Sequence, residues 1–286
     1  MKPIELKAVT FNVFHDYPRC RHVEPRLAIL EDALAAEAPD VVILQEASAS
    51  LLYGHLVERL VSRLRSRGLG YDFHYAAANG SLARGEAFEE GSAILSRAPI
   101  RDAAVRRLAE DHPVEREYQG YRFVEYRIAL AATIAFREGV ELEVVGAHVT
   151  DATSPPGEPS ARRRQVEDLA TFVAARSAGR RPAVVGGDFN AVPESPEIGW
   201  LRARGLLDVC AAAEPGPTND PDDRDLESPR DTARHRIDHL FVLPGPARFE
   251  VRATRLFLAS PVEVEPGRRL WASDHNGVLA ELAMFH

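Results

Sequence analysis

The chain has 286 residues, of which 45% are hydrophobic and 27% are charged, so it can bury a large core and is neither disordered nor fibrous. Its formal net charge of −8 excludes attraction of the whole surface to nucleic acid or anionic lipid, although it leaves a local basic groove open. Two cysteines, Cys20 and Cys210, exclude a disulfide framework and indicate a reducing compartment, for which we expect the cytoplasm.

The amino-terminal segment predicts a strand and not a signal peptide. Residues 1–14 mix Lys2, Glu5 and Lys7 with apolar residues and lack an unbroken apolar stretch. No segment reaches the roughly twenty apolar residues that a membrane helix needs, so we expect a soluble protein without membrane insertion.

Short segments rich in Val, Ile and Phe recur along the chain and predict a strand-dominated α/β fold. The expected strands cover residues 6–14, 41–45, 73–77, 92–96, 122–136, 141–148, 183–187, 237–243, 251–258 and 277–282. Three stretches with a helical apolar stripe lie between strands. The first begins near Glu24 and Pro25 and ends before Pro39, the second covers residues 56–64, and the third follows Ser160 as its cap.

Two stretches rich in charge and glycine, residues 79–91 and 214–236, are predicted to be surface loops. Long loops beside a rigid scaffold often select the substrate, but they can equally be solvated connections. The sequence has no internal repeat, low-complexity tract or linker. We therefore expect one domain over residues 1–286.

Polar residues stand at the ends of several predicted strands or just beyond them. They are Asn12, Glu46, His148, Asp188, Asn190, Asp238, Asp274 and His275. Each has a structural explanation by itself, because Asp and Asn after a strand commonly make hydrogen bonds in turns. Together they predict a site, because strand ends hold their side chains with little freedom.

The chemistry of this set indicates a hard metal ion and a phosphoryl group. Its four carboxylates have no accompanying thiolate, and oxygen ligands of this kind select Mg²⁺ or Mn²⁺. Its amides and two imidazoles suit negative charge that builds up on a phosphoryl oxygen. His235 and His239 have the spacing of a helical zinc pair, but they flank a strand-like segment, so we expect no zinc there.

Six short motifs in order resemble the endonuclease/exonuclease/phosphatase superfamily, whose founding fold is that of DNase I. The motifs are Thr10–Phe11–Asn12, Leu44–Gln45–Glu46, Ala147–His148–Val149, Gly187–Asp188–Phe189–Asn190, Arg236–Ile237–Asp238–His239 and Ser273–Asp274–His275. The resemblance spans residues 10–275. It implies a four-layer α-β-β-α sandwich of two mostly antiparallel sheets, with a site at one end that hydrolyses a phosphoester with the help of a metal ion.

The resemblance also implies the metal ligands. Glu46 would be the principal ligand of Mg²⁺ or Mn²⁺. Asn12 and Asp274 would assist it, either directly or through water.

The remaining strand-end residues would act on the substrate. By the resemblance, Asp188 and Asn190 face the attacking water and the phosphate, and Asp238 orients His275. His148 would donate a hydrogen bond to a phosphate oxygen. We therefore expect a phosphodiesterase or phosphatase that acts by in-line attack of water.

Two further residues are candidates for substrate binding. Arg127 resembles an arginine that precedes a strand in the family, and Thr218 resembles a threonine that precedes the Ile-Asp segment. A catalytically inactive binding module is an alternative to the enzyme. The presence of all the expected carboxylates and both histidines favours the enzyme.

The substrate class stays open. The AP-endonuclease branch usually has a tryptophan where Phe11 stands, and the branch that cleaves tyrosyl-DNA links typically has a threonine in place of Phe189, so both are disfavoured. A DNA or RNA endonuclease or exonuclease is the main alternative, because a few arginines on one rim suffice to bind phosphates. The candidates for such a rim are Arg19, Arg21, Arg84 and Arg122. The sequence does not indicate the oligomeric state.

Overall fold

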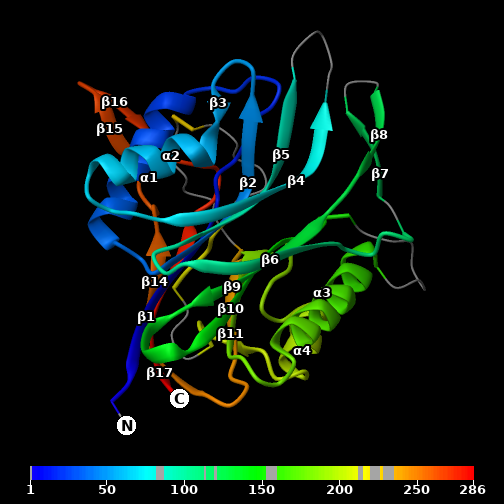
Figure 1. Ribbon diagram of the computed structural model, residues 1–286. Coiled ribbons are helices and arrows are strands. Elements are labelled where there is room, and N and C mark those ends of the chain that lie inside the picture. The colour runs from blue at the N-terminus through cyan, green and yellow to red at the C-terminus, as the bar shows by residue number, and fades with distance from the viewer. Residues whose placement is uncertain are drawn as a thin grey trace.

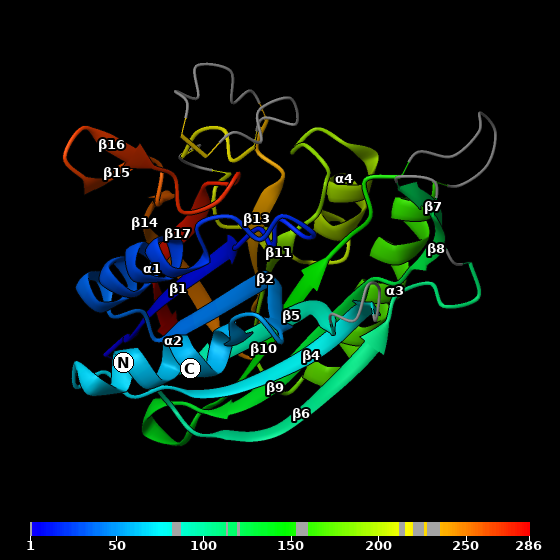
Figure 2. The same ribbon diagram turned by 90° about the horizontal axis from the view of Figure 1, so that it is seen from above.

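The computed structural model describes residues 2–81, 87–112, 114–118, 121–152, 160–211, 215–219, 226–227 and 235–286. Two large sheets pack face to face, and helices cover the outer face of each sheet, as Figures 1 and 2 show from two directions. This arrangement confirms the predicted four-layer α/β sandwich of two mostly antiparallel sheets. No helix in the described ranges is long and apolar enough to cross a bilayer.

The first sheet carries two helices on its outer face. Its strands follow the order β14 (Arg248–Phe257), β17 (Gly277–Phe285), β1 (Ile4–Asn12), β2 (Val41–Ser50), β5 (Phe88–Ser96) and β4 (Asp72–Ser81), and the short β3 (Gly54–His55) pairs with β2. The helices are α1 (Val23–Glu37) and α2 (Leu56–Ser66).

The second sheet lies against the first on one face and carries the other two helices on its other face. Its strands follow the order β12 (Leu207–Asp208), β13 (Asp238–Leu243), β11 (Ala183–Asp188), β10 (Glu141–His148), β9 (Ile128–Ala135) and β6 (Ile100–Arg107). The helices are α3 (Ala161–Ser177) and α4 (Pro196–Arg202). The remaining elements are the hairpins β7 (Val114–Tyr118)–β8 (Tyr121–Glu125) and β15 (Val262–Glu265)–β16 (Arg268–Leu270), and a 3-10 turn, η2 (Arg137–Gly139).

Both faces of the central strands are buried, which explains their nearly continuous apolar sequences. In β1, Val9 and Phe11 pack in the core beneath α1 and α2, whereas Leu6 and Ala8 pack in the core between the sheets. Successive side chains of a strand point to opposite faces. A strand with helices on one side and a second sheet on the other therefore needs apolar residues at almost every position.

Each sheet contains one parallel pair of strands that are connected through a helix. The pair β1–β2 is connected by α1, and the pair β10–β11 by α3. Because parallel strands end at the same edge of a sheet, Asn12 lies beside Gln45 and His148 lies beside Asp188. The two pairs thus bring three of the predicted polar residues, and Gln45 directly before Glu46, to one end of the sandwich.

Several expected elements differ from the structure. The predicted strand over 122–136 is broken after Glu125, so Arg127 lies between β8 and β9. The loop predicted over 79–91 was wrong at both ends, because β4 continues to Ser81 and β5 begins at Phe88, and residues 82–86 lie outside the described ranges. The strand β6 and the helix α4 were not predicted. Most of the predicted loop over 214–236 lies outside the described residues.

Candidate active site

Unusual backbone conformations position the carboxylates of Glu46 and Asp188 at the end of the sandwich. Glu46 has a left-handed φ of 54° at a bulge in the pairing of β2 with β5, and this conformation directs its side chain away from the ladder. Asp188 follows Gly187, whose φ is 156°. A Cβ atom at Gly187 would lie 1.9 Å from the carbonyl oxygen of Ala147, so only glycine fits before Asp188.

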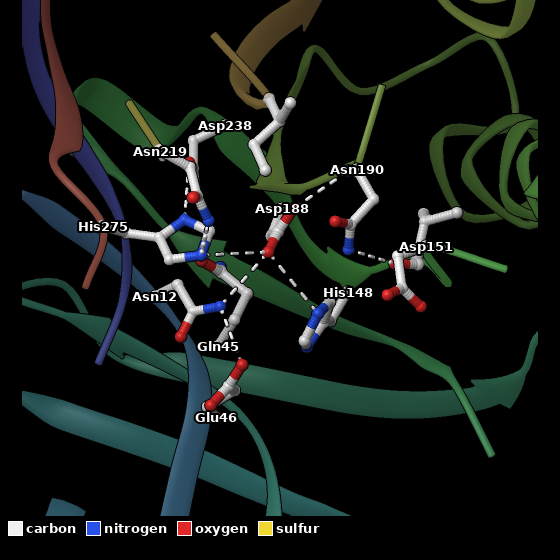
Figure 3. A network of polar contacts seen from close by, with 12 residues as sticks. Asn12, Gln45, Glu46, His148, Asp151, Asp188, Asn190, Asn219, Asp238 and His275 are labelled. Carbon is white, nitrogen blue, oxygen red and sulfur yellow. Dashed lines mark hydrogen bonds and ion pairs between the residues drawn. The ribbon is translucent and has the colours of Figure 1, made fainter. Parts of the chain in front are cut away.

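The carboxylate of Asp188 lies at the centre of the site, as Figure 3 shows. Its Oδ2 atom lies 3.2 Å from Asn12 Nδ2, 3.5 Å from His148 Nε2 and 3.7 Å from His275 Nε2. Its Oδ1 atom accepts a hydrogen bond of 2.9 Å from the backbone N–H of Asn190. Burial raises the pKa of Asp188 to about 7, helped by the charge of Asp238 and opposed by that of His275. Asp188 can therefore accept a proton near neutral pH.

His275 is held by a buried carboxylate on its far side. Its Nδ1 lies 2.9 Å from Asp238 Oδ2, and its Nε2 lies 2.5 Å from Asn219 Nδ2. Burial alone would lower the pKa of His275, but the charges of Asp238 and Asp188 outweigh it and raise the pKa to about 10. His275 is therefore an imidazolium at neutral pH, so its Nε2–H lies 3.7 Å from Asp188 Oδ2 and requires the oxygen, not the nitrogen, of the Asn219 amide beside it.

Thr218 fixes the position of Asp238. The Thr218 hydroxyl oxygen accepts hydrogen bonds of 3.0 Å and 3.1 Å from the backbone N–H groups of Ile237 and Asp238. Thr218 is fully buried. Its hydroxyl thus supports the backbone that carries the Asp238–His275 pair.

Glu46 lies beside Asp188 and is linked to it through Asn12. The Nδ2 atom of Asn12 donates to Glu46 Oε1 at 3.0 Å as well as to Asp188, while its Oδ1 accepts from the backbone N–H of Phe14. The second Glu46 oxygen accepts from the His15 N–H at 3.1 Å and lies 3.5 Å from the His15 ring. Burial would raise the pKa of Glu46, but the neighbouring imidazole of His15 and the hydrogen bond from Asn12 help to outweigh it, so the pKa falls below its usual range and Glu46 is ionised.

His148 is kept neutral by burial and by an arginine. The Nη1 atom of Arg127 lies 2.7 Å from His148 Nδ1, and Arg127 Nη2 donates to Glu125 at 3.0 Å. Burial, reinforced by the charge of Arg127, holds the pKa of His148 well below its ordinary value. Arg127 Nη1 lies nearer to Nδ1, at 2.7 Å, than to Nε2, at 3.1 Å, so we assign Nδ1 as the acceptor and place the proton on Nε2, which lies 3.5 Å from Asp188.

The structure gathers most of the residues predicted from the strand ends. Those within one contact network are Asn12, Glu46, His148, Asp188, Asn190, Asp238 and His275. Asp274 is buried next to His275, and its Oδ1 accepts from the Ser273 hydroxyl at 3.3 Å. Arg127 and Thr218 contact His148 and Asp238.

Sequence reasoning missed His15 and Asn219. Asn219 directly follows Thr218, and that position is the one signal that could have indicated it. His15 lies in the segment after β1, and no pattern in the sequence pairs it with Glu46.

Two packed sheets with carboxylates, imidazoles and amides gathered at one end are typical of metal-dependent hydrolases. The comparisons with known proteins agree with this class. A family model described as the endonuclease/exonuclease/phosphatase family matches residues 9–275, so the chain belongs to this family, whose members act on phosphoesters. A comparison with curated proteins finds no significant match.

Solved structures resemble the fold over almost the whole chain. An endonuclease/exonuclease/phosphatase family protein from Bacteroides thetaiotaomicron is 22% identical, with a TM-score of 0.72 and 99% of each chain covered. A mannosyl-6-phosphatase from the same species is 22% identical, with a TM-score of 0.71 over 97% of this chain and 99% of that one. TDP2 from D. rerio, in complex with a single-stranded DNA product, is 18% identical, with a TM-score of 0.67 over 97% and 98%. These likenesses show the shared fold.

The donors in this site fit the hard divalent cation on which the family depends. Atoms of Asp188, Asp238 and His275 lie within 4.8 Å of one another, and Glu46 is ionised beside them. In the described part of the chain, Asp238 Oδ1 is buried without a hydrogen-bond partner. Because His275 is protonated, the carboxylates are the metal donors of this cluster, and carboxylates without a thiolate suit Mg²⁺ or Mn²⁺ and do not suit a soft metal.

Proposed function

We propose that the protein is a divalent-metal-dependent phosphoester hydrolase that acts on a small phosphoester by in-line attack of water. The position of Asp188 is the observation that carries this proposal. One of its oxygens faces an amide N–H, a neutral imidazole N–H and an imidazolium within 3.2–3.7 Å. A buried carboxylate with a pKa of about 7 in such a setting suits a general base for water.

The other residues stabilise negative charge on the phosphoryl group. His275 stays charged because Asp238 holds its Nδ1–H, so Nε2 can donate to a phosphoryl oxygen. With its proton on Nε2, the tautomer that the closer contact of Arg127 with Nδ1 favours, His148 can donate to another oxygen. Asn190 follows the same strand end as Asp188, and its Nδ2 donates to the carbonyl oxygen of Val149 at 2.9 Å.

The candidate metal residues lie on the Glu46 side of the site. When bound, Mg²⁺ or Mn²⁺ would neutralise a phosphoryl oxygen and the departing oxyanion. We propose Glu46 as its principal ligand, with Asp274 assisting. Asn12 presents its nitrogen to both Glu46 and Asp188, which supports a role in aligning these two carboxylates.

The charge around the site favours a small substrate over a polynucleotide. Arg116 is bound to Glu125 and Asp151, and Arg127 is bound to Glu125. Arg19 and Arg21, two of the arginines expected to form a basic rim, both pair with Asp16. Arginines that are already neutralised by carboxylates attract a polyphosphate backbone weakly.

The other two arginines of the expected rim do not bear on this choice. Arg84 lies outside the described residues, and only the backbone of Arg122 is described, within β8. The Bacteroides neighbour that is a mannosyl-6-phosphatase supports a small phosphoester, and TDP2 supports a nucleic acid. The pairing of the rim arginines therefore decides our choice.

We also propose that residues 1–286 form one domain. The core between the sheets contains residues from both ends of the chain, including Ile4 and Met284. The cytoplasmic location stays a prediction from the low cysteine content.

The proposal can be tested with purified protein, Mg²⁺ or Mn²⁺, and three substrates. These are p-nitrophenyl phosphate, its bis-nitrophenyl diester, and a single-stranded DNA oligonucleotide. We expect hydrolysis of a small ester that EDTA abolishes, and a fall of about a hundredfold or more for His275→Gln. Asp32→Asn, an exposed carboxylate that pairs with Arg67, is the matched control and should keep full activity.

Two results would count against the proposal. Full activity in EDTA would remove the metal requirement. Cleavage of DNA alone, with a steep loss as salt is added, would establish the nuclease instead.

A further inference from the structure

Arg26 is a buried cation on the first turns of α1, behind the candidate active site. Its Nε donates to the carbonyl oxygen of Ala272 at 2.7 Å, and its Nη2 donates to that of Phe14 at 2.5 Å and to that of Val13. A longer contact of 3.5 Å joins Nη1 to the carbonyl of Arg21. No carboxylate contacts this guanidinium in the part of the chain that the structure describes.

The carbonyls that Arg26 binds belong to two segments that carry candidate metal ligands. Val13 and Phe14 follow Asn12 and lead to His15, which contacts Glu46 through both its backbone and its ring. Ala272, which is 246 positions from Arg26, comes just before Ser273, Asp274 and His275. Arg26 therefore links the Glu46 side of the site to the Asp274 side.

A second contact joins the same two segments at the site itself. The hydroxyl of Ser273 donates to the carbonyl oxygen of Asn12 at 2.6 Å. Arg26 and Ser273 therefore attach the two segments to each other at two separate points.

The surroundings of Arg26 make its charge effective. Apolar side chains, including those of Phe11, Leu27 and Leu30, line the space next to the guanidinium. Burying a charge there costs free energy that a neutral residue would avoid, so stability alone does not explain an arginine. Hydrogen bonds from a charged donor are also stronger than neutral ones, and only the planar guanidinium reaches carbonyls in several directions. The charges of Asp274 and Glu46 act on Arg26 across this space.

We propose that Arg26 is a positioning residue that sets the affinity of the site for its divalent cation. It holds the segment after β1 and the segment from Ala272 to His275 at the spacing that lets Glu46 and Asp274 serve one ion. This inference rests on the proposed function. Loss of a group that orients metal ligands typically weakens metal binding by about 10–100-fold, and we expect a loss of that size here.

The test is direct titration of the full-length protein with Mn²⁺ by isothermal calorimetry, with folding checked by circular dichroism. Arg26→Gln should raise the Kd for Mn²⁺ by about 10–100-fold, and Arg26→Lys, which keeps the charge but loses the planar fork, should fall between it and the wild type. Arg67→Gln is the matched control, because this exposed arginine pairs with Asp32 and Glu31 of α1, and its Kd should not change.

Turnover gives a second readout that a purely structural role would not move. In Arg26→Gln, the Mn²⁺ concentration for half-maximal activity should rise with the Kd, while kcat at saturating Mn²⁺ recovers to near the wild-type value. A lower melting temperature with an unchanged Kd would overturn the proposal and leave Arg26 as a structural residue.

Hydrogen exchange of the wild-type protein tests whether one ion holds both segments, and it can be used even if the variants do not fold. Addition of Mg²⁺ should slow hydrogen exchange in residues 13–15 and in residues 272–276 together, because one ion would hold both segments. Protection of one segment alone, or of neither, would overturn the role of Arg26. If the wild type binds no Mn²⁺, the proposed metal-dependent function itself fails. If it binds Mn²⁺ and both variants do so equally well, only the inference about Arg26 fails.

Discussion

Catalysis and stability should respond in opposite directions when Asp188 is replaced by asparagine. The substitution keeps the shape of the side chain and removes its negative charge. Turnover should fall by about a hundredfold or more, because the proposed acceptor for the proton of water is lost. Folding without a bound metal should become more favourable, because the burial of an ionised carboxylate no longer has to be paid for.

The size of the stability effect follows from the pKa of Asp188. This pKa rises from an ordinary 3.8 to about 7 in the folded protein, a difference of about 3 units. One unit corresponds to 1.36 kcal/mol, so ionised Asp188 destabilises the fold by up to about 4 kcal/mol. The folded state binds the proton more tightly than the unfolded state, so protonation of Asp188 stabilises the fold relative to its ionised form. This stabilisation is complete below pH 3.8 and is lost as the pH rises through 7. The gain in Asp188→Asn should therefore be absent at pH 4 and nearly complete at pH 8.

Urea unfolding in EDTA at pH 4 and pH 8, followed by circular dichroism, measures this difference between variant and wild type. Carboxylates away from the site titrate equally in both proteins, so their effects cancel in the comparison. Asp32→Asn should show no such change, since Asp32 is exposed. Wild-type turnover by Asp188→Asn would refute its role as a base. A variant that is less stable than the wild type at pH 8 would refute the electrostatic reasoning.

Three further substitutions test the support around the site. Asp238→Asn should lower the pKa of His275 from about 10 toward its ordinary range, as NMR titration of the ring would show, and should reduce turnover by about a hundredfold. An unshifted ring pKa would contradict the pairing. Gly187→Ala should lower the free energy of unfolding by at least about 3 kcal/mol, because the added Cβ would collide with the backbone of Ala147. An unfolding midpoint in urea equal to that of the wild type would show that β10 and β11 can move apart to accept it. Asp208→Asn should cost about 1–3 kcal/mol, since the guanidinium groups of Arg236 and Arg202, each 2.9 Å away, lose a charged acceptor; an unchanged unfolding midpoint would show that these bonds are dispensable.

The glycines in residues 79–91 were interpreted as turn signals, and this interpretation gave a wrong prediction at both ends of the stretch. Residues 79–91 contain glycines and acidic residues, which predict a loop, yet β4 and β5 pair across most of this stretch. Gly91 is needed within the strand, because a Cβ there would lie 1.9 Å from the carbonyl oxygen of Ala76 next to a bulge. A close approach between strands and a turn both select glycine, and the sequence alone does not distinguish them.

The local pattern of apolar and polar residues was sufficient to predict most of the central strands, three helices and the polar residues at the strand ends. The apolar runs predicted the strands because residues buried on both faces must be apolar, and Ser160 predicted the start of α3, where its hydroxyl accepts from Arg163 N–H at 2.9 Å. The sequence by itself thus determined the strand-dominated α/β fold class, and its motifs indicated the family whose layered sandwich the resemblance implied.

Only the tertiary structure decided which side chains meet. Asn12 reaches Asp188 across 176 positions, and Arg26 reaches Ala272 across 246. No periodicity in the chain records such contacts, because they depend on how the two sheets pair and pack. For the same reason, the structure alone revealed that Thr218 supports Asp238 and that His15 contacts Glu46. Local sequence fixes the direction of each side chain from its strand, and the packing of distant strands determines what that side chain faces.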